Sequence, residues 1–398
     1  MAPPRSGSPD WNPVIIVDCS GSMDYPRDKM IAAKRATAAA IDALREGVSF
    51  AVIAGNDQAG CVYPGDGSLA VATAATRAAA RKAVNRLGAS GGTAIGRWLS
   101  LAGQVLANQP AAIRHAILLT DGRNQHETPV ELAQALSRCQ GMFVCDCRGV
   151  GTDWNVEELR RISSALLGSV DIVADPAGLE ADFRAMTAAA MGKAVADVRL
   201  RLWTPQGAVV RFVKQVAPTV EDLTARRVAS GPRHGDYPTG SWGTESRDYH
   251  LCVEVNPGEV GDVMLAARAG LVMSTSDGER PVPAQGLVKA VWTDDEALST
   301  RISGEVAHYT GQAELAAAIQ EGMAAHRDGD LSRATSRLGR ALALAKETGN
   351  TGTAELLAKV VDVVDPVTGT VRLRAKVSDA DAMTLDTRST RTSRVRKG

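Results

Sequence analysis

The sequence predicts an α/β fold: a doubly wound, mostly parallel sheet, followed by an antiparallel β-sandwich and a short helical segment. Over residues 14–192, apolar stretches of strand length alternate with amphipathic stretches of helix length. This order produces parallel strands that are covered by helices on both faces. Over 193–293, apolar and polar residues alternate between Gly/Pro turns, which is typical of antiparallel strands. Over 294–365 the apolar spacing is helical.

The two ends of the chain differ in composition from these three parts. A chain of 398 residues is too long for one compact core, so several domains are expected. We expect residues 1–13 to be a flexible leader. Residues 366–398 carry eight Lys/Arg against three acidic residues and are rich in hydroxyl groups. Because they lack the apolar groups that a core needs, we expect a flexible, basic, Thr-rich tail.

The elements of the first domain follow from its periodicity. A buried strand "VIIV" at 14–17 comes first, and a helix with one apolar face follows it and stops at Gly47. The other expected strands are 48–55, 115–122, 141–150 and 170–175, and the expected helices are 28–47, 92–109, 129–140, 156–168 and 177–192. In the sandwich, 231–250 is expected to be a long loop. In the helical segment, 317–350 resembles one tetratricopeptide-type hairpin, which needs neighbours to bury its apolar face.

Bulk composition excludes several function classes. Lys+Arg and Asp+Glu are both 45, so no global field attracts nucleic acid or an anionic membrane. No apolar run reaches the roughly 18 residues of a membrane span, and the N-terminus does not have the pattern of a secretory signal. We therefore expect a cytoplasmic protein with reduced thiols. Cys145 and Cys147 alternate on one strand; a soft-metal or redox pair is one interpretation, and two small buried side chains are the favoured one.

Three segments end in polar residues at one edge of the predicted sheet. Asp18 ends the first strand, and Ser20 and Ser22 lie on the turn after it. Thr93 stands behind two glycines just before a helix, and Asp121 ends another strand. In such folds the carboxyl ends of the strands form the ligand site. Carboxylates and hydroxyls are hard ligands suited to Mg²⁺, Mn²⁺ or Ca²⁺, and neutral hydroxyls leave room for an acidic group of a partner. For any one segment alone, a capped strand end is the alternative.

These residues resemble the complete metal-ion-dependent adhesion site of von Willebrand factor A (VWA) domains, over roughly residues 14–190. The resemblance implies a Rossmann-like fold, and it implies that Ser20, Ser22 and commonly Thr93 contact the metal directly. It implies that Asp18 and Asp121 act through water or orient the hydroxyls. It also implies a non-enzymatic module in which an acidic residue of a protein partner completes the coordination of Mg²⁺.

Two residues beyond Asp121 lie in the loop "GRNQHETP". His126 and Glu127 are expected near the metal rim, where they could contact a partner. A solvated loop is the alternative for both.

The end of the chain carries hydroxyls among arginines. Thr384, Thr387, Thr390 and Thr392 are candidate phosphorylation sites, because phosphate adds negative charge that an arginine-lined pocket recognises. A solubilising tail and a nucleic-acid contact are the alternatives, and the absence of interleaved aromatics disfavours nucleic acid.

The phrases "CDCRGVGTDW" and "TLDTRSTRTSRV" are similar to actinobacterial proteins that combine an intracellular VWA domain, a β-sandwich, a helical segment and a Thr-rich tail. This resemblance implies partners among Ser/Thr kinases and forkhead-associated (FHA) proteins, which bind phosphothreonine. It implies a regulatory or signalling assembly. An accessory subunit of an AAA+ ATPase complex is the alternative function. A metal-dependent phosphohydrolase is disfavoured, because two-metal hydrolysis usually needs more carboxylates than these two.

Overall fold

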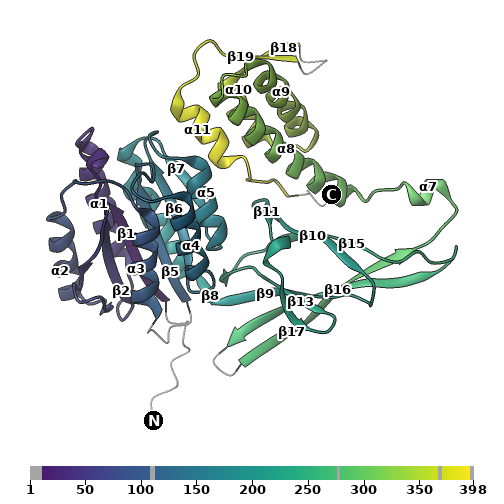
Figure 1. Ribbon diagram of the computed structural model, residues 1–398, viewed down its shortest axis with the longest axis horizontal. Helices are drawn as coiled ribbons and strands as arrows, with labels where there is room; N and C mark the ends of the chain where they lie inside the picture. The colour runs from purple at the N-terminus through teal and green to yellow at the C-terminus, as the bar shows by residue number, and fades with distance from the viewer. Residues whose placement is uncertain (1–10, 108–112, 276–277, 366–369, 395–398) are drawn as a thin grey trace. The chain divides into compact units, whose positions relative to one another are not determined.

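The computed structural model describes residues 11–107, 113–275, 278–365 and 370–394. The chain forms two compact units (Figure 1). The first runs to Asp197 and includes Gly240–Thr244, and the second contains Val198–Thr239 and the chain from Glu245 onward. No helix in the described ranges is long and apolar enough to cross a membrane.

The first unit contains a mixed sheet in the order β3-β2-β1-β5-β6-β7, with β4 paired to β2. Its strands are β1 (Trp11–Asp18), β2 (Ser49–Gly55), β3 (Ala59–Tyr63), β4 (Ala70–Val71), β5 (Ile113–Thr120), β6 (Val144–Val150) and β7 (Val170–Val173). Neighbours from β2 to β7 are parallel, and β3 and β4 run antiparallel to β2. The strands after β1 are added on one side of it up to β4, and β5 to β7 are added on the other side. The polar ends of β1 and β5 therefore lie next to each other at the switch point, where ligand sites form in such sheets.

Helices surround this sheet and bury its apolar residues. They are α1 (Asp28–Ala43), α2 (Ala74–Asn85), α3 (Ile95–Ala107), α4 (Pro129–Cys139), α5 (Val156–Ala165) and α6 (Leu179–Met191). α1 packs against both α2 and α6, and α4 packs against α3 and α5. The predicted doubly wound α/β fold is therefore confirmed. The sequence patterns missed α2, β3 and β4, because these elements lie at the sheet edge and bury few side chains.

The predicted start of the fold is wrong by three residues. Trp11, Asn12 and Pro13 belong to β1 and pair in register with Ile113–His115 of β5. Trp11 is buried, so the strand gains a core side chain where a flexible leader was expected. Residues 1–10 of that leader lie outside the described residues.

The second unit begins with two antiparallel sheets, as expected for a sandwich. One has the order β11-β10-β15 and the other β12-β13-β9-β16-β17. The strands are β9 (Asp197–Trp203), β10 (Val209–Ala217), β11 (Glu221–Asp222), β12 (Val228–Gly231), β13 (His234–Pro238), β15 (Asp248–Glu254), β16 (Val263–Thr275) and β17 (Gly278–Val291). Leu200 and Tyr237 of the larger sheet share one core cluster with Val213 of the smaller.

The expected long loop at 231–250 is wrong. It contains β13, which pairs on both sides, with β12 and with β9. It also contains β14 (Trp242–Gly243), which pairs with β8 (Lys193–Val195) in the first unit. Glycines and prolines make these strands hard to predict from the sequence, because a segment such as "HGDYP" lacks the alternation of apolar and polar residues that is typical of a half-buried strand.

A helical core completes the second unit. It consists of α7 (Glu296–Ser299), α8 (Gly304–Arg327), α9 (Leu331–Glu347), α10 (Thr351–Val360) and α11 (Asp379–Arg388), with the hairpin β18 (Val361–Asp365) and β19 (Thr370–Leu373). The expected flexible tail is therefore wrong for 370–394. Val371 and Leu385 enter the core built by α8 to α10. The average composition of 366–398 does not reveal these two apolar residues, because they become buried only against a core that α8 to α10 supply. Residues 366–369 and 395–398 lie outside the described residues.

Candidate metal centre

Asp18 lies at the carboxyl end of β1 with none of its surface exposed. Its Oδ1 accepts a hydrogen bond from the backbone N–H of Ser20 at 2.7 Å. Its Oδ2 accepts from the Thr120 hydroxyl at 2.6 Å. Because one bond comes from the following turn and the other from β5, the carboxylate is held between the two strands of the switch point.

The two serine hydroxyls lie next to each other on the turn after β1. Ser20 Oγ is 3.0 Å from Ser22 Oγ, and Ser22 Oγ donates to Asp121 Oδ1 at 2.7 Å. Asp121 follows β5 and is fully buried. The first and third predicted segments are therefore joined by direct side-chain contacts.

Thr93 reaches the same place through a loop that is tied to the first. Gly21 N–H donates to the carbonyl of Gly91 at 3.0 Å, and Ser90 N–H donates to the carbonyl of Cys19 at 2.8 Å. Gly91 has a φ of +75°, and a Cβ there would lie 2.2 Å from Asp57 Oδ1. Glycine is needed at this position for both reasons.

Gly122 shows where the side chains converge. A Cβ on this residue would lie 2.9 Å from Thr93 Oγ1, 3.4 Å from Ser22 Oγ and 3.7 Å from Asp18 Oδ2. Oxygens from the first two predicted segments therefore line the space beside Gly122, which directly follows Asp121 of the third. Among the residues the structure describes, no group of three or more His, Cys, Asp or Glu could hold a metal. A mixed set of hydroxyls and carboxylates suits a hard divalent cation such as Mg²⁺, Mn²⁺ or Ca²⁺.

The electrostatics of the site also favour a cation. Burial raises the pKa of Asp18 to about 6, although hydrogen bonds from Ser20 and Thr120 lower it, and the charge of Asp121 adds to the increase. Desolvation and a neighbouring carboxylate both disfavour the ionised form. A cation between these groups would relieve both effects.

Lys29 is a buried residue of the site that the sequence patterns missed. It lies in the first turn of α1 and is 4% exposed. Its Nζ is 2.8 Å from Asp121 Oδ2 and 2.9 Å from Asp153 Oδ2. Burial lowers the pKa of Lys29, but the bonds to the two aspartates outweigh this and the pKa is raised. A lysine at the start of a helix is usually exposed, so no pattern in the sequence marks it.

His126 and Glu127 lie beside the Thr93 loop. The backbone N–H of His126 donates to the carbonyl of Thr93 at 2.9 Å, and Thr93 N–H donates to His126 Nδ1 at 3.3 Å. Glu127 Oε2 accepts from Gly96 N–H at 2.6 Å, in the first turn of α3. Both residues brace the loop that presents Thr93, and the His126 side chain is otherwise exposed.

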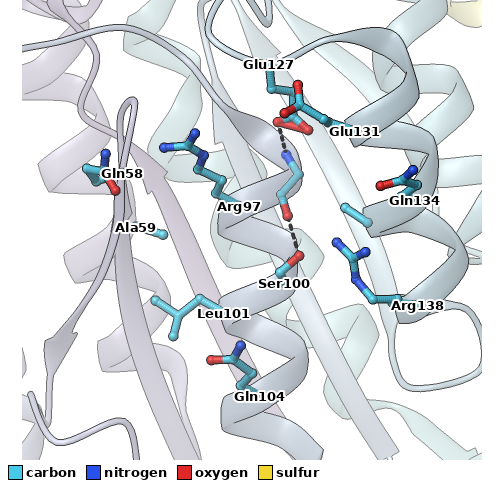
Figure 2. Close-up of a pocket in the computed structure, with 12 residues that line it drawn as sticks. Gln58, Ala59, Arg97, Ser100, Leu101, Gln104, Glu127, Glu131, Gln134 and Arg138 are labelled. Atoms are coloured by element: carbon cyan, nitrogen blue, oxygen red, sulfur yellow. Dashed lines mark hydrogen bonds between the residues drawn. The ribbon is translucent and has the colours of Figure 1, made fainter.

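Glu127 also lines a depression of about 420 Å³ over α3, which has Gln58 and Ala59 on one side and residues of α4 on the other (Figure 2). Carboxylates and guanidinium groups both face it, including Glu131 and Arg138. The depression is polar and offers no set of converging donors comparable with the metal centre.

The other candidate groups lie elsewhere. Cys145 and Cys147 are both buried on β6, with their sulfur atoms 4.0 Å apart. Contact with Cys147 and burial raise the pKa of the Cys145 thiol well above its usual value. Such an inert thiol fits the packing interpretation better than a redox one.

The four candidate threonines belong to the second unit. Thr387 is 2% exposed on α11 and is therefore closed to a kinase while the helix is folded. Thr384, Thr390 and Thr392 are partly exposed. The Thr392 hydroxyl donates to the carbonyl of Val216 at 2.7 Å, which ties the chain end to β10.

Two family models match parts of this chain. The family model of the von Willebrand factor type A domain matches residues 12–172. The model of the von Willebrand factor type A C-terminal domain matches residues 343–389. The second match begins within α9 and ends at α11, and so includes residues 366–389 of the segment that was expected to be a tail.

Individual relatives extend the comparison. A protein from Synechocystis without an assigned function is 31% identical over 222 residues, which are 54% of this chain and 50% of that protein. The match thus spans half the length of this curated relative. The solved structure of the ArnB paralog VWA2 from Sulfolobus acidocaldarius has the same fold at 14% identity, with a TM-score of 0.55 over 96% of this chain and 88% of that one.

A solved structure of a von Willebrand factor type A protein from Catenulispora acidiphila covers nearly the whole chain. It is 56% identical and has a TM-score of 0.94, over 97% of this chain and 91% of that one. The chain therefore belongs to the von Willebrand factor type A family.

Proposed function

We propose that this protein binds a partner protein through a divalent cation, held by Ser20, Ser22 and Thr93 and oriented by Asp18 and Asp121. The observation that carries the proposal is the convergence of Thr93 Oγ1, Ser22 Oγ and Asp18 Oδ2 on the space beside Gly122. Membership of the VWA family supports a metal-dependent protein-interaction module. Mg²⁺ is the proposed ion in the cell, with Mn²⁺ and Ca²⁺ as chemically similar substitutes.

The donor set explains why the partner should be acidic. The hydroxyls of Ser20, Ser22 and Thr93 carry no charge, and Asp121 Oδ2 already accepts a hydrogen bond from Lys29 Nζ. A bound divalent cation would then keep uncompensated positive charge. A carboxylate from a partner supplies both a hard ligand and the missing negative charge.

Neighbouring side chains define the proposed contact surface. His126 is exposed next to Thr93, and Glu127 lines the depression in Figure 2. We propose that both flank the incoming partner segment. The cation would supply the bond to the partner carboxylate, and the chain itself positions the hydroxyls beside Gly122.

Two measurements test the proposal. Titration calorimetry with Mn²⁺ should detect one site in the wild type, and Thr93→Val should weaken it while leaving the fold intact by circular dichroism. The matched control is Thr310→Val, which alters an exposed threonine of α8 whose hydroxyl donates to the carbonyl of Val306, and it should bind Mn²⁺ as the wild type does. Affinity capture in Mg²⁺ and in EDTA should then retain a partner only with metal. Equal Mn²⁺ binding by wild type and Thr93→Val would overturn the proposal.

Phosphorylation of the C-terminal threonines is the regulatory part of the proposal, with a Ser/Thr kinase and an FHA-domain protein as partners. The proposal now applies to Thr384, Thr390 and Thr392, because Thr387 is buried. Phosphopeptide mapping of natively expressed protein tests it. Complete absence of phosphate from 379–394 would remove this part and leave the metal-dependent module untouched.

The alternative function is an accessory subunit of an AAA+ remodelling or cofactor-insertion complex. An ATPase recovered in the Mg²⁺-dependent capture would favour it. Hydrolysis of a generic phosphoester that is lost in Thr93→Val would instead favour a phosphohydrolase.

A further inference from the structure

Lys29 is a buried, positively charged residue inside the proposed metal centre. Lys29 is enclosed as well as paired: a Cβ on Gly151, which has a φ of +65°, would lie 3.5 Å from Lys29 Cε. The ammonium group therefore lies in a closed position between the loop after β6 and Asp121. It cannot swing into solvent without breaking two ion pairs.

The two oxygens of the Asp121 carboxylate have different partners. Oδ1 accepts from Ser22, and Oδ2 accepts from Lys29. Asp153, the second partner of Lys29, has a side chain that is 68% exposed, so water screens its charge. The buried charges of the centre are thus two carboxylates and one ammonium, which gives one net negative charge.

We propose that Lys29 is a specificity-determining residue, which weakens binding of the divalent cation alone and so makes tight binding depend on an incoming carboxylate. This inference rests on the proposed function. Like charges repel strongly where water is excluded, and Lys29 places a fixed positive charge behind the carboxylate that faces the metal. An anionic ligand offsets that charge, so metal and carboxylate bind cooperatively.

The test measures the dissociation constant of Mn²⁺ by electron paramagnetic resonance, with sodium acetate and with sodium chloride at equal ionic strength. Lys29→Met should bind Mn²⁺ alone about 10-fold more tightly than the wild type. It should also lose most of the tightening that acetate produces. Lys29→Arg keeps the charge and should stay near the wild type. Lys34→Met removes a partly exposed lysine of the same helix, bonded to the Asn85 carbonyl, and serves as the control.

Asp153→Asn provides an independent arm with the opposite sign. It removes the negative charge paired with Lys29, which water screens in part, so it should weaken Mn²⁺ binding by a smaller factor than Lys29→Met strengthens it, and increase the effect of acetate. This arm remains informative if Lys29→Met does not fold. Unchanged or weaker Mn²⁺ binding by a folded Lys29→Met would show that Lys29 only positions Asp121 and would overturn the inference. A wild type that binds no Mn²⁺ would overturn the proposed function itself.

Discussion

Substitution of Gly122 by alanine tests the metal centre without removing any ligand. The new methyl carbon would lie 2.9 Å from Thr93 Oγ1 and 3.4 Å from Ser22 Oγ, in the space these oxygens share. Gly122 does not have a positive φ, so alanine introduces no backbone strain. The side chain of Thr93 has to move away, which separates it from the other ligands.

The expected effect can be stated as a stability difference. At a metal concentration 100 times the Kd, binding stabilises the wild type by about 2.7 kcal/mol. If Gly122→Ala weakens metal binding about 100-fold, as disturbed ligand shells can, the same concentration stabilises it by only about 0.4 kcal/mol. For a unit of this size, 1 kcal/mol corresponds to about 2–4 °C in Tm. The metal-induced increase in Tm should therefore fall from about 5–10 °C to about 1 °C.

The assay is a thermal melt followed by far-UV circular dichroism, in Mg²⁺ and in EDTA. Gly88→Ala is the matched control, because a Cβ there meets nothing within 4 Å and its φ is not positive. Gly88→Ala should keep the full increase in Tm. A Gly122→Ala protein that also keeps the full increase would show that the cation does not occupy the space beside Gly122.

Four further outcomes are expected. Burial raises the pKa of Asp18 to about 6, so the folded state holds this proton more tightly than the unfolded state. Without metal, the contribution of Asp18 to the free energy of unfolding should fall by about 2 kcal/mol between pH 4 and 6, while Mn²⁺ affinity rises; a flat Mn²⁺ profile would contradict this. Thr120→Val removes the 2.6 Å bond to Asp18; it should cost about 1–3 kcal/mol in denaturant melts and move the midpoint of Mn²⁺ binding to higher pH. Leu385→Ala leaves a cavity at a fully buried position of α11, so it should destabilise the second unit by about 2–5 kcal/mol and make 370–394 more sensitive to protease. Unchanged digestion would argue against a packed helix. Tyr25→Ser alters a side chain that is 86% exposed, close in sequence to Ser20 and Ser22. It should change the free energy of unfolding by no more than about 0.5 kcal/mol but weaken metal-dependent partner capture. Unchanged capture would exclude Tyr25 from the contact surface.

Much of the fold could be predicted because its signals are local. The strand at 14–17 and the helix that starts at Asp28 follow from apolar spacing over a few turns of chain, and the structure forms both. The α2 region gave no such signal, since only two of its side chains are buried. β13 and α11 were missed for a related reason: each depends on a surface supplied by other elements.

The sequence by itself determined the α/β order and the polar residues at the strand ends. Asp18, Ser20, Ser22, Thr93 and Asp121 could be selected because parallel strands bring their carboxyl ends to one edge. That rule applies to any sheet with this connectivity, so the residues are brought together without knowledge of individual contacts.

Only the tertiary structure decided the electrostatics of the centre and the fate of the chain end. Lys29 meets Asp121 across 92 residues, and Thr120 meets Asp18 across 102. The burial that raises the Asp18 pKa comes from neighbours supplied by the whole domain. In the same way, Leu385 is buried only because α8 to α10 form a core around it. Periodicity reports which face of an element is apolar, whereas charge pairing and burial depend on which elements meet.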